Sequence, residues 1–225
     1  MRTMFLSDLA TVRPAVKQTL VTFFIVFLIL LFCMAPEGAI AAVVVMIPYL
    51  FFYTLAVGDE SSGWEKMRAT LPMSRKQVVL GRYAVVGSLI VAAFVVALAT
   101  GVVVMAIAGA IPNAPDWLAR LAFSSERLGN AVASGVLGAA CSLLFCAATL
   151  PFAFRFGITR STRVYPILAV LAFVMASAFI VDQGIPVNLD AVSPVLICGV
   201  PLLGAIALCA VSMWASIRLY EAREL

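Results

Sequence analysis

Long apolar runs separated by short polar segments make up most of this chain. A helix needs roughly 17 to 25 mostly apolar residues to cross about 30 Å of hydrocarbon, and most of the runs reach that length. The pattern therefore predicts an all-α, multi-pass membrane protein with a single domain over residues 1–225. The six expected transmembrane helices cover residues 17–34, 40–57, 75–109, 129–154, 164–181 and 194–217.

Nearly all basic residues fall on one side of these six spans. Of the 15 Lys and Arg residues, only Arg120 and Arg127 lie on the other side. The rest lie in the termini, in the segment 58–82 and in the segment 155–163. Short loops rich in Lys and Arg face the cytoplasm, so both termini and these two segments are expected there. Orientation in a lipid bilayer explains the positive charge, and no nucleic-acid partner is expected.

The segment before the first span has its own pattern. Met1, Phe5, Leu9 and Val12 recur at helical spacing. This spacing predicts an interfacial elbow helix on the cytoplasmic leaflet, with a frayed amphipathic tail as the alternative.

Composition narrows the class further. With 64% hydrophobic and 12% charged residues, the chain departs strongly from soluble globular domains. The 5 cysteines all lie in expected spans, without the C-x-x-C spacing of a redox or metal pair. We read them as small packing residues and expect no metal site.

Small residues four apart mark faces on which helices can approach closely. The sets are Ala93, Ala97 and Gly101; Ser134 and Gly138; and Gly135 and Ala139. A face of this kind can meet another helix of the same chain or a second copy, and packing within the chain is the default expectation.

The most polar segment of the chain, residues 58–77, lies between spans two and three. Ser61 and Ser62 can cap a short helix with Trp64, Met67 and Leu71 on one apolar stripe. Pro72 would end that helix. The alternative is a solvated loop in which Trp64 anchors at the lipid headgroups.

A second helix start follows at once. Ser74-x-x-Gln77 before an apolar run is a capping-box pattern. The third span is therefore expected to begin in the cytoplasm and to be about 50 Å long at 1.5 Å per residue. A short transverse helix followed by a protruding transmembrane helix would form a rigid lever.

Two motifs resemble a known family. The first comprises Asp59-Glu60, Trp64, Leu71-Pro72-x-Ser74-Arg75, Val78-Val79 and Arg82-Tyr83, and the second is Pro151-Phe152-x-Phe154-Arg155-Phe156-Gly157. Together they resemble the small type 2 ATP-binding cassette (ABC) transporter permeases of the bacterial peptide-exporter and bacteriocin-immunity kind. Family members often have Lys where this chain has Arg82, a change that keeps the charge.

The resemblance implies a permease subunit of an ABC exporter in the inner or plasma membrane. It would move an amphipathic or hydrophobic substrate, such as a peptide, outward. Its partners would be a separate ABC ATPase subunit and a second permease copy or a paralogue. Lys17, Lys66 and Lys76 do not follow Gly, so the chain lacks a P-loop. No cofactor is expected in this chain, and ATP and magnesium would be bound by the partner ATPase.

The residues 58–77 are the expected ATPase-coupling element. Its named members are Asp59, Glu60, Trp64, Glu65, Lys66, Met67, Arg68, Leu71, Pro72, Ser74, Arg75 and Lys76. The second cytoplasmic loop supplies Arg155, Gly157, Arg160 and Arg163.

Three other functions compete with this interpretation. An enzyme is disfavoured because the chain has no His and shows no base, metal ligand or nucleophile pair. An ion-coupled secondary transporter usually has ionisable residues within the membrane, and these spans have essentially none away from their ends, although prolines inside spans could form a site. A non-transporting membrane assembly protein stays open.

Two residue groups bear on these alternatives. Serines inside helices usually bond to their own backbone, which is the expectation for Ser88, Ser134, Ser142 and Ser212. Aromatic residues could line a substrate path, although packed or lipid-facing positions are commoner. They are Phe23, Phe24, Phe27, Phe51, Phe52, Tyr53 and Phe94.

Overall fold

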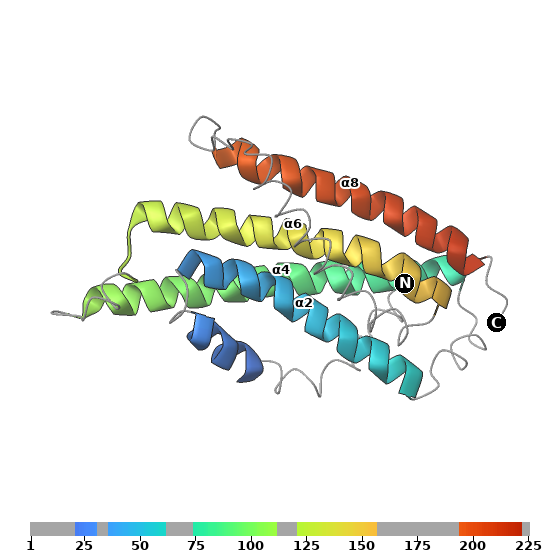
Figure 1. Cartoon of the computed structure of the whole chain (residues 1–225), viewed down its shortest axis with the longest axis horizontal. Helices are drawn as coiled ribbons and strands as arrows, with labels where there is room; N and C mark the ends of the chain where they lie inside the picture. The colour runs from blue at the N-terminus through green and yellow to red at the C-terminus, as the bar shows by residue number, and fades with distance from the viewer. Residues whose placement is uncertain (1–20, 31–35, 62–73, 112–120, 157–193, 222–225) are drawn as a thin grey trace, which may run out of the picture.

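The computed structural model describes residues 21–30, 36–61, 74–111, 121–156 and 194–221. Within these ranges every regular element is a helix, as predicted (Figure 1). The long helices are α2 (Pro36–Ser61), α4 (Arg75–Ala110), α6 (Ser125–Phe156) and α8 (Pro194–Glu221). A shorter apolar helix, Val21–Leu30, precedes them.

Helix boundaries follow the apolar pattern closely. α4 begins at the expected residue, and α2, α6 and α8 extend a few residues beyond the predicted spans. The polar segment that starts at Gly58 begins within the last turn of α2, which continues to Ser61. A lone Gly weakens a helix without stopping it. Ser61 is the last residue of α2, and the short helix expected after it lies outside the described residues.

Within the described ranges, three helices are long and apolar enough to cross a membrane. They cover Lys76–Ala110, Ser125–Pro151 and Cys198–Leu219. The first two expected spans overlap the helix Val21–Leu30 and the apolar stretch Gly38–Phe51 of α2. The elbow helix and the span over 164–181 lie outside the described residues.

The helices line up along one axis. α2, α6 and α8 run in the same direction and α4 runs against them, so the start of α4 lies at the same end as the C-terminal ends of the other three (Figure 1). That end, called here the α4-start end, carries Arg75, Lys76, Arg155 and Arg218, whereas Arg127 lies in the first turn of α6 at the opposite end. The charge asymmetry of the sequence thus appears as an asymmetry of the bundle.

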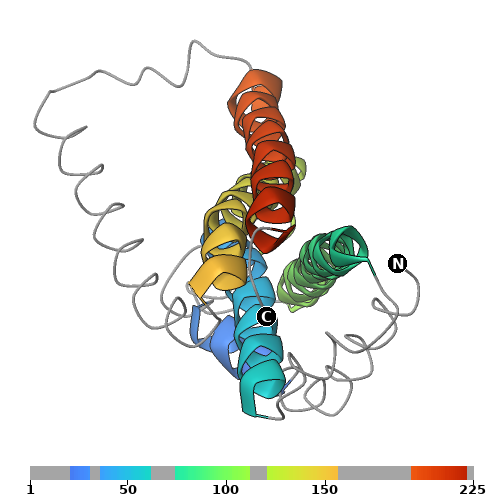
Figure 2. The same cartoon turned by 90° about the vertical axis from the view of Figure 1, so that its right-hand side faces the viewer.

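α4 and α6 form the centre of the bundle, because each of them packs on α2 and on α8 as well as on the other (Figure 2). The main core cluster joins the 21–30 helix to α2, α4 and α6. Its fully buried members include Phe27, Ile40, Val43, Val44 and Met105. Tyr49 of α2 also makes an edge-to-face contact with Phe145 of α6, with ring centroids 5.2 Å apart.

The small-residue faces pack within the chain. Ala97 is completely buried in the main core cluster. A Cβ on Gly138 would lie 2.8 Å from the carbonyl oxygen of Ala41 and 3.1 Å from its Cα, so α6 lies directly on the backbone of α2. A Cβ on Gly135 would meet the ring of Phe94 at 2.7 Å. These contacts confirm the default expectation for the described helices.

Candidate functional site

The start of α4 has the predicted capping box. The Ser74 hydroxyl accepts a hydrogen bond from the Gln77 backbone N–H at 3.3 Å, and the Gln77 side-chain oxygen accepts one from the Ser74 N–H at 3.4 Å. Ser74 itself is extended, with φ −71° and ψ 143°. The cap fixes where α4 begins, within the predicted coupling segment 58–77.

The structure places part of the predicted coupling element. Asp59 and Glu60 belong to the last turn of α2, and Arg75 and Lys76 are the first two residues of α4. Arg155 of the second cytoplasmic loop lies in the last turn of α6. These helix ends lie together at the α4-start end (Figure 1). The remaining members lie outside the described residues: Trp64, Glu65, Lys66, Met67, Arg68, Leu71, Pro72, Gly157, Arg160 and Arg163.

A polar cluster joins three helices a few turns after the start of α4. The Tyr83 hydroxyl of α4 lies 2.8 Å from Ser212 Oγ and 3.0 Å from Ser216 Oγ, both on α8. Ser212 Oγ donates in turn to the Ala147 carbonyl of α6. Both serines are buried. We call Tyr83, Ser212, Ser216 and the Ala147 carbonyl the hydroxyl cluster.

Pro151 explains why the Ala147 carbonyl accepts from another helix. Proline has no backbone N–H, so the carbonyl four residues earlier loses its helical donor. α6 continues through Pro151, and Ser212 supplies the missing hydrogen bond. Within apolar surroundings a neighbouring side chain commonly satisfies a carbonyl freed in this way.

The carbonyl also fixes the direction of every hydrogen bond in the cluster. A carbonyl only accepts, so the one hydroxyl hydrogen of Ser212 points to Ala147. Tyr83 must then donate to Ser212, and Ser216 must donate to Tyr83. The cluster is a directed chain from Ser216 through Tyr83 and Ser212 to the backbone of α6.

Sequence reasoning missed this role of Ser212. Ser88 and Ser134 behave as expected, because their hydroxyls donate to Val85 O and Ala131 O of their own helices at 2.7 and 3.0 Å. Ser212 instead crosses to α4 and α6. The available signals were the spacing of four between Ser212 and Ser216 and the proline four residues after Ala147.

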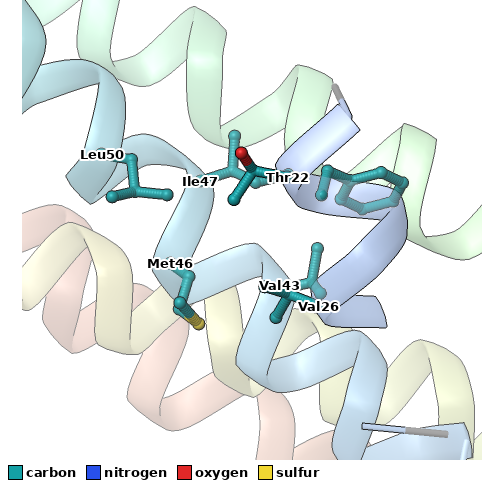
Figure 3. Close-up of a pocket in the computed structure, with 7 residues that line it drawn as sticks. Thr22, Val26, Val43, Met46, Ile47 and Leu50 are labelled. Atoms are coloured by element: carbon teal, nitrogen blue, oxygen red, sulfur yellow. The ribbon is translucent and has the colours of Figure 1, made fainter. Parts of the chain in front are cut away.

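A cavity of about 240 Å³ adjoins the hydroxyl cluster between α4, α6 and α8. Its lining is otherwise apolar or sulfur-bearing: Tyr83, Val86, Gly87, Leu143, Cys146, Ile206, Cys209, Ala210 and Met213. A smaller space of about 10 Å³ lies between the 21–30 helix and α2, where Thr22, Val26, Val43, Met46, Ile47 and Leu50 converge (Figure 3). It has room for about one water molecule.

The aromatic residues considered for a substrate path mostly pack elsewhere. Phe23, Phe27 and Phe51 are buried in core clusters, and Phe24 is half exposed. None of them lines the larger cavity. The side chains of Phe52 and Tyr53 lie outside the described set. Among the described residues no group of His, Cys, Asp and Glu could hold a metal ion.

These features define a helical membrane protein. The start of α4 is capped and charged at one end, and the buried hydroxyl cluster lies further along the same helix. Residues 3–221 match the family model described as ABC-2 family transporter protein. The chain therefore belongs to the ABC-2 transporter family. Comparisons with curated proteins and with solved structures gave no match.

Proposed function

We propose that this chain is the membrane-spanning permease subunit of an ABC exporter in the inner or plasma membrane. A separate ATPase subunit would dock on residues 58–77 and drive outward movement of an amphipathic or hydrophobic substrate, such as a peptide. The observation that carries this proposal is the family match over residues 3–221. Membership of this family implies an ABC ATPase partner and favours a permease over an ion-coupled transporter or an assembly protein.

The geometry of the described helices supports the placement of the docking site. α2 ends and α4 begins at the α4-start end (Figure 1), so the chain between them is held by two long helices. The capping box stabilises the first turn of α4, which contains the last residues of the segment 58–77. A force on residues 58–77 would therefore act directly on α4.

Substitutions in the segment test the docking proposal. Trp64→Ala should lower affinity for the ATPase at least about 30-fold, since buried aromatic anchors of interfaces contribute about 2 kcal/mol or more. Glu65→Lys should also weaken ATPase binding, because it reverses a charge that would align the two docking surfaces. The measurements are co-purification with the ATPase and ATP-driven transport in proteoliposomes.

Matched controls come from two residues that the charge pattern of the sequence places on the outer side. Trp117→Ala and Glu126→Lys change the same residue types on the expected outer side, so ATPase binding should persist in both. Normal transport by Trp64→Ala and Glu65→Lys, together with loss of ATPase binding on substitution of Arg160 or Arg163, would instead assign docking to the second cytoplasmic loop.

The functional assembly should contain two permease chains and two ATPase subunits. Two ATPase subunits must close on each other to hydrolyse ATP, and each needs a permease docking segment. The second permease chain would be a copy of this one or a paralogue. Native mass spectrometry of the purified complex should give two of each, and a fully active complex with one of each would exclude this stoichiometry.

A further inference from the structure

The hydroxyl cluster joins α4, α6 and α8 at one point within the bundle. Tyr83 follows Ser74 by nine residues along a single helix, which is about 13 Å at 1.5 Å per residue. α4 contains no proline, and its first turn is capped. Displacement of the α4 start would therefore be transmitted to Tyr83 with little loss.

We propose that the Tyr83 hydroxyl is a positioning group for transport, through which movement of α4 reaches α8 and α6. This inference rests on the proposed ABC permease function. Tyr83 acts through its hydrogen bonds to Ser212 and Ser216 and requires no contact with substrate.

Because its hydrogen bonds have a fixed direction, the hydroxyl cluster is sensitive to displacement of α4. Each hydroxyl hydrogen of the hydroxyl cluster has one acceptor. Pro151 leaves the Ala147 carbonyl without a donor from its own helix. Withdrawal of Tyr83 removes the acceptor of Ser216 and the donor to Ser212. The cluster therefore has a complete and a broken arrangement, which is the property that a switching contact needs.

The cavity gives α4 room to move. Tyr83 and Gly87 of α4 face it together with Cys146 of α6 and Cys209 of α8. A Cβ on Gly87 would have no heavy atom within 4 Å. Beside the cluster, Ile217 of α8 packs near Val78 and Val79 of α4, and one turn further along α4, at Gly87, the space is open. The contact of α6 with α2 at Gly138 has no such space.

Removal of one hydroxyl tests the proposal. Tyr83→Phe keeps the ring and deletes the oxygen that both serines contact. Transport per ATP hydrolysed should fall about 3- to 20-fold, which is the range that interhelical hydrogen bonds in membranes support. ATPase binding should be unchanged. Ser88→Ala is the matched control, because the Ser88 hydroxyl lies on the same helix and donates to Val85 O of that helix. This variant should transport as wild type does.

A second readout separates positioning from a purely structural role. Cys209 lines the cavity. Cys198 lies away from it, in the first turns of α8, and its thiol is 3.7 Å from Ala133 O of α6. Modification of each thiol by N-ethylmaleimide is followed by site-resolved mass spectrometry, without nucleotide and with ATP plus vanadate. In the wild-type complex the rate at Cys209, relative to Cys198, should differ between the two states. Tyr83→Phe should abolish that difference.

Ser216→Ala provides an independent variant, because it removes one hydrogen bond and leaves the Tyr83 ring and the Ser212–Ala147 bond in place. If the Tyr83→Phe protein does not accumulate, Ser216→Ala tests the role of the Tyr83 hydroxyl in its place. Wild-type transport and a wild-type Cys209 difference in the variant would overturn the proposal. Absence of ATP-dependent transport in the wild-type complex would instead overturn the proposed function, and the role of Tyr83 with it.

Discussion

Single residues set the spacing of the helices in this bundle. Gly138 is the clearest case, since its missing side chain lets α6 rest on the backbone of α2 at Ala41. A Cβ on Gly129 of the same helix would have no heavy atom within 4 Å. The two glycines therefore offer a direct comparison of a packed and an open site.

Gly138→Ala should destabilise the protein by about 1–3 kcal/mol, the usual cost of overpacking a core. The added methyl would meet backbone atoms, which cannot rotate away. Gly129→Ala should be neutral or slightly stabilising, because Ala favours helix over Gly. Thermal unfolding in detergent, followed by size-exclusion chromatography, measures both. A Gly138→Ala protein as stable as Gly129→Ala would show that the α2–α6 contact is looser than described.

Two hydrogen-bonded sites show what the sequence could and could not predict. The Ser74 cap depends on residues three apart, so its pattern was readable directly. Tyr83 and Ser212 are 129 positions apart, and their contact depends on how three helices pack. A serine in an apolar helix carries no mark of whether it bonds to its own backbone or to a neighbour. Pro151 marks an orphaned carbonyl but does not identify the donor.

Among the elements, α4 is the longest described helix, with 36 residues, or about 54 Å at 1.5 Å per residue. That length exceeds the roughly 30 Å of the hydrocarbon core. The early turns of α4 are therefore expected to stand in the cytoplasmic headgroups or beyond, as predicted for a lever. Long apolar runs predicted the positions of α4, α6 and α8 well. The last turn of α2 is polar, so the apolar pattern could not include it in a predicted span.

Ser74→Ala should cost about 1 kcal/mol of local stability, the usual effect of losing an N-cap. The Gln77 N–H would lose its side-chain acceptor. Amide hydrogen exchange in the first turn of α4 should speed up about fivefold, and transport per ATP should fall. Ser74→Asp keeps a capping oxygen and should restore both.

Ser124 supplies a control for this prediction at the opposite end, where its hydroxyl accepts from the Arg127 N–H at 3.4 Å. Ser124→Ala should raise exchange at the start of α6 without changing coupling. Equal loss of coupling in the two alanine variants would argue against a special role for the start of α4.

The two ends of the bundle differ in their number of basic residues and in how they would be anchored in a membrane. At the α4-start end, the Arg218 guanidinium lies over the exposed ring of Trp214, 5.4 Å from its centroid. Trp and basic residues together are typical of a membrane interface. Arg75, Lys76 and Arg155 lie at the same end (Figure 1). The Trp214 contact indicates a membrane interface at this end, and the excess of basic residues predicts that it is the cytoplasmic interface.

Site-directed labelling tests that orientation for the whole chain. Single cysteines at Ser61, Thr159 and Glu224, placed in a variant without native cysteines, should react with a membrane-impermeant maleimide only after the cytoplasmic side is exposed. Cysteines at Asn113 and Asn188 should react from the outside in intact cells, because short loops poor in Lys and Arg are translocated. α6 and α8 run in the same direction (Figure 1), which is the arrangement that an expected fifth span over 164–181 requires. Labelling of Asn188 and Thr159 from the same side would contradict that span, and labelling of Asn113 from the cytoplasm would contradict the orientation of α4 itself.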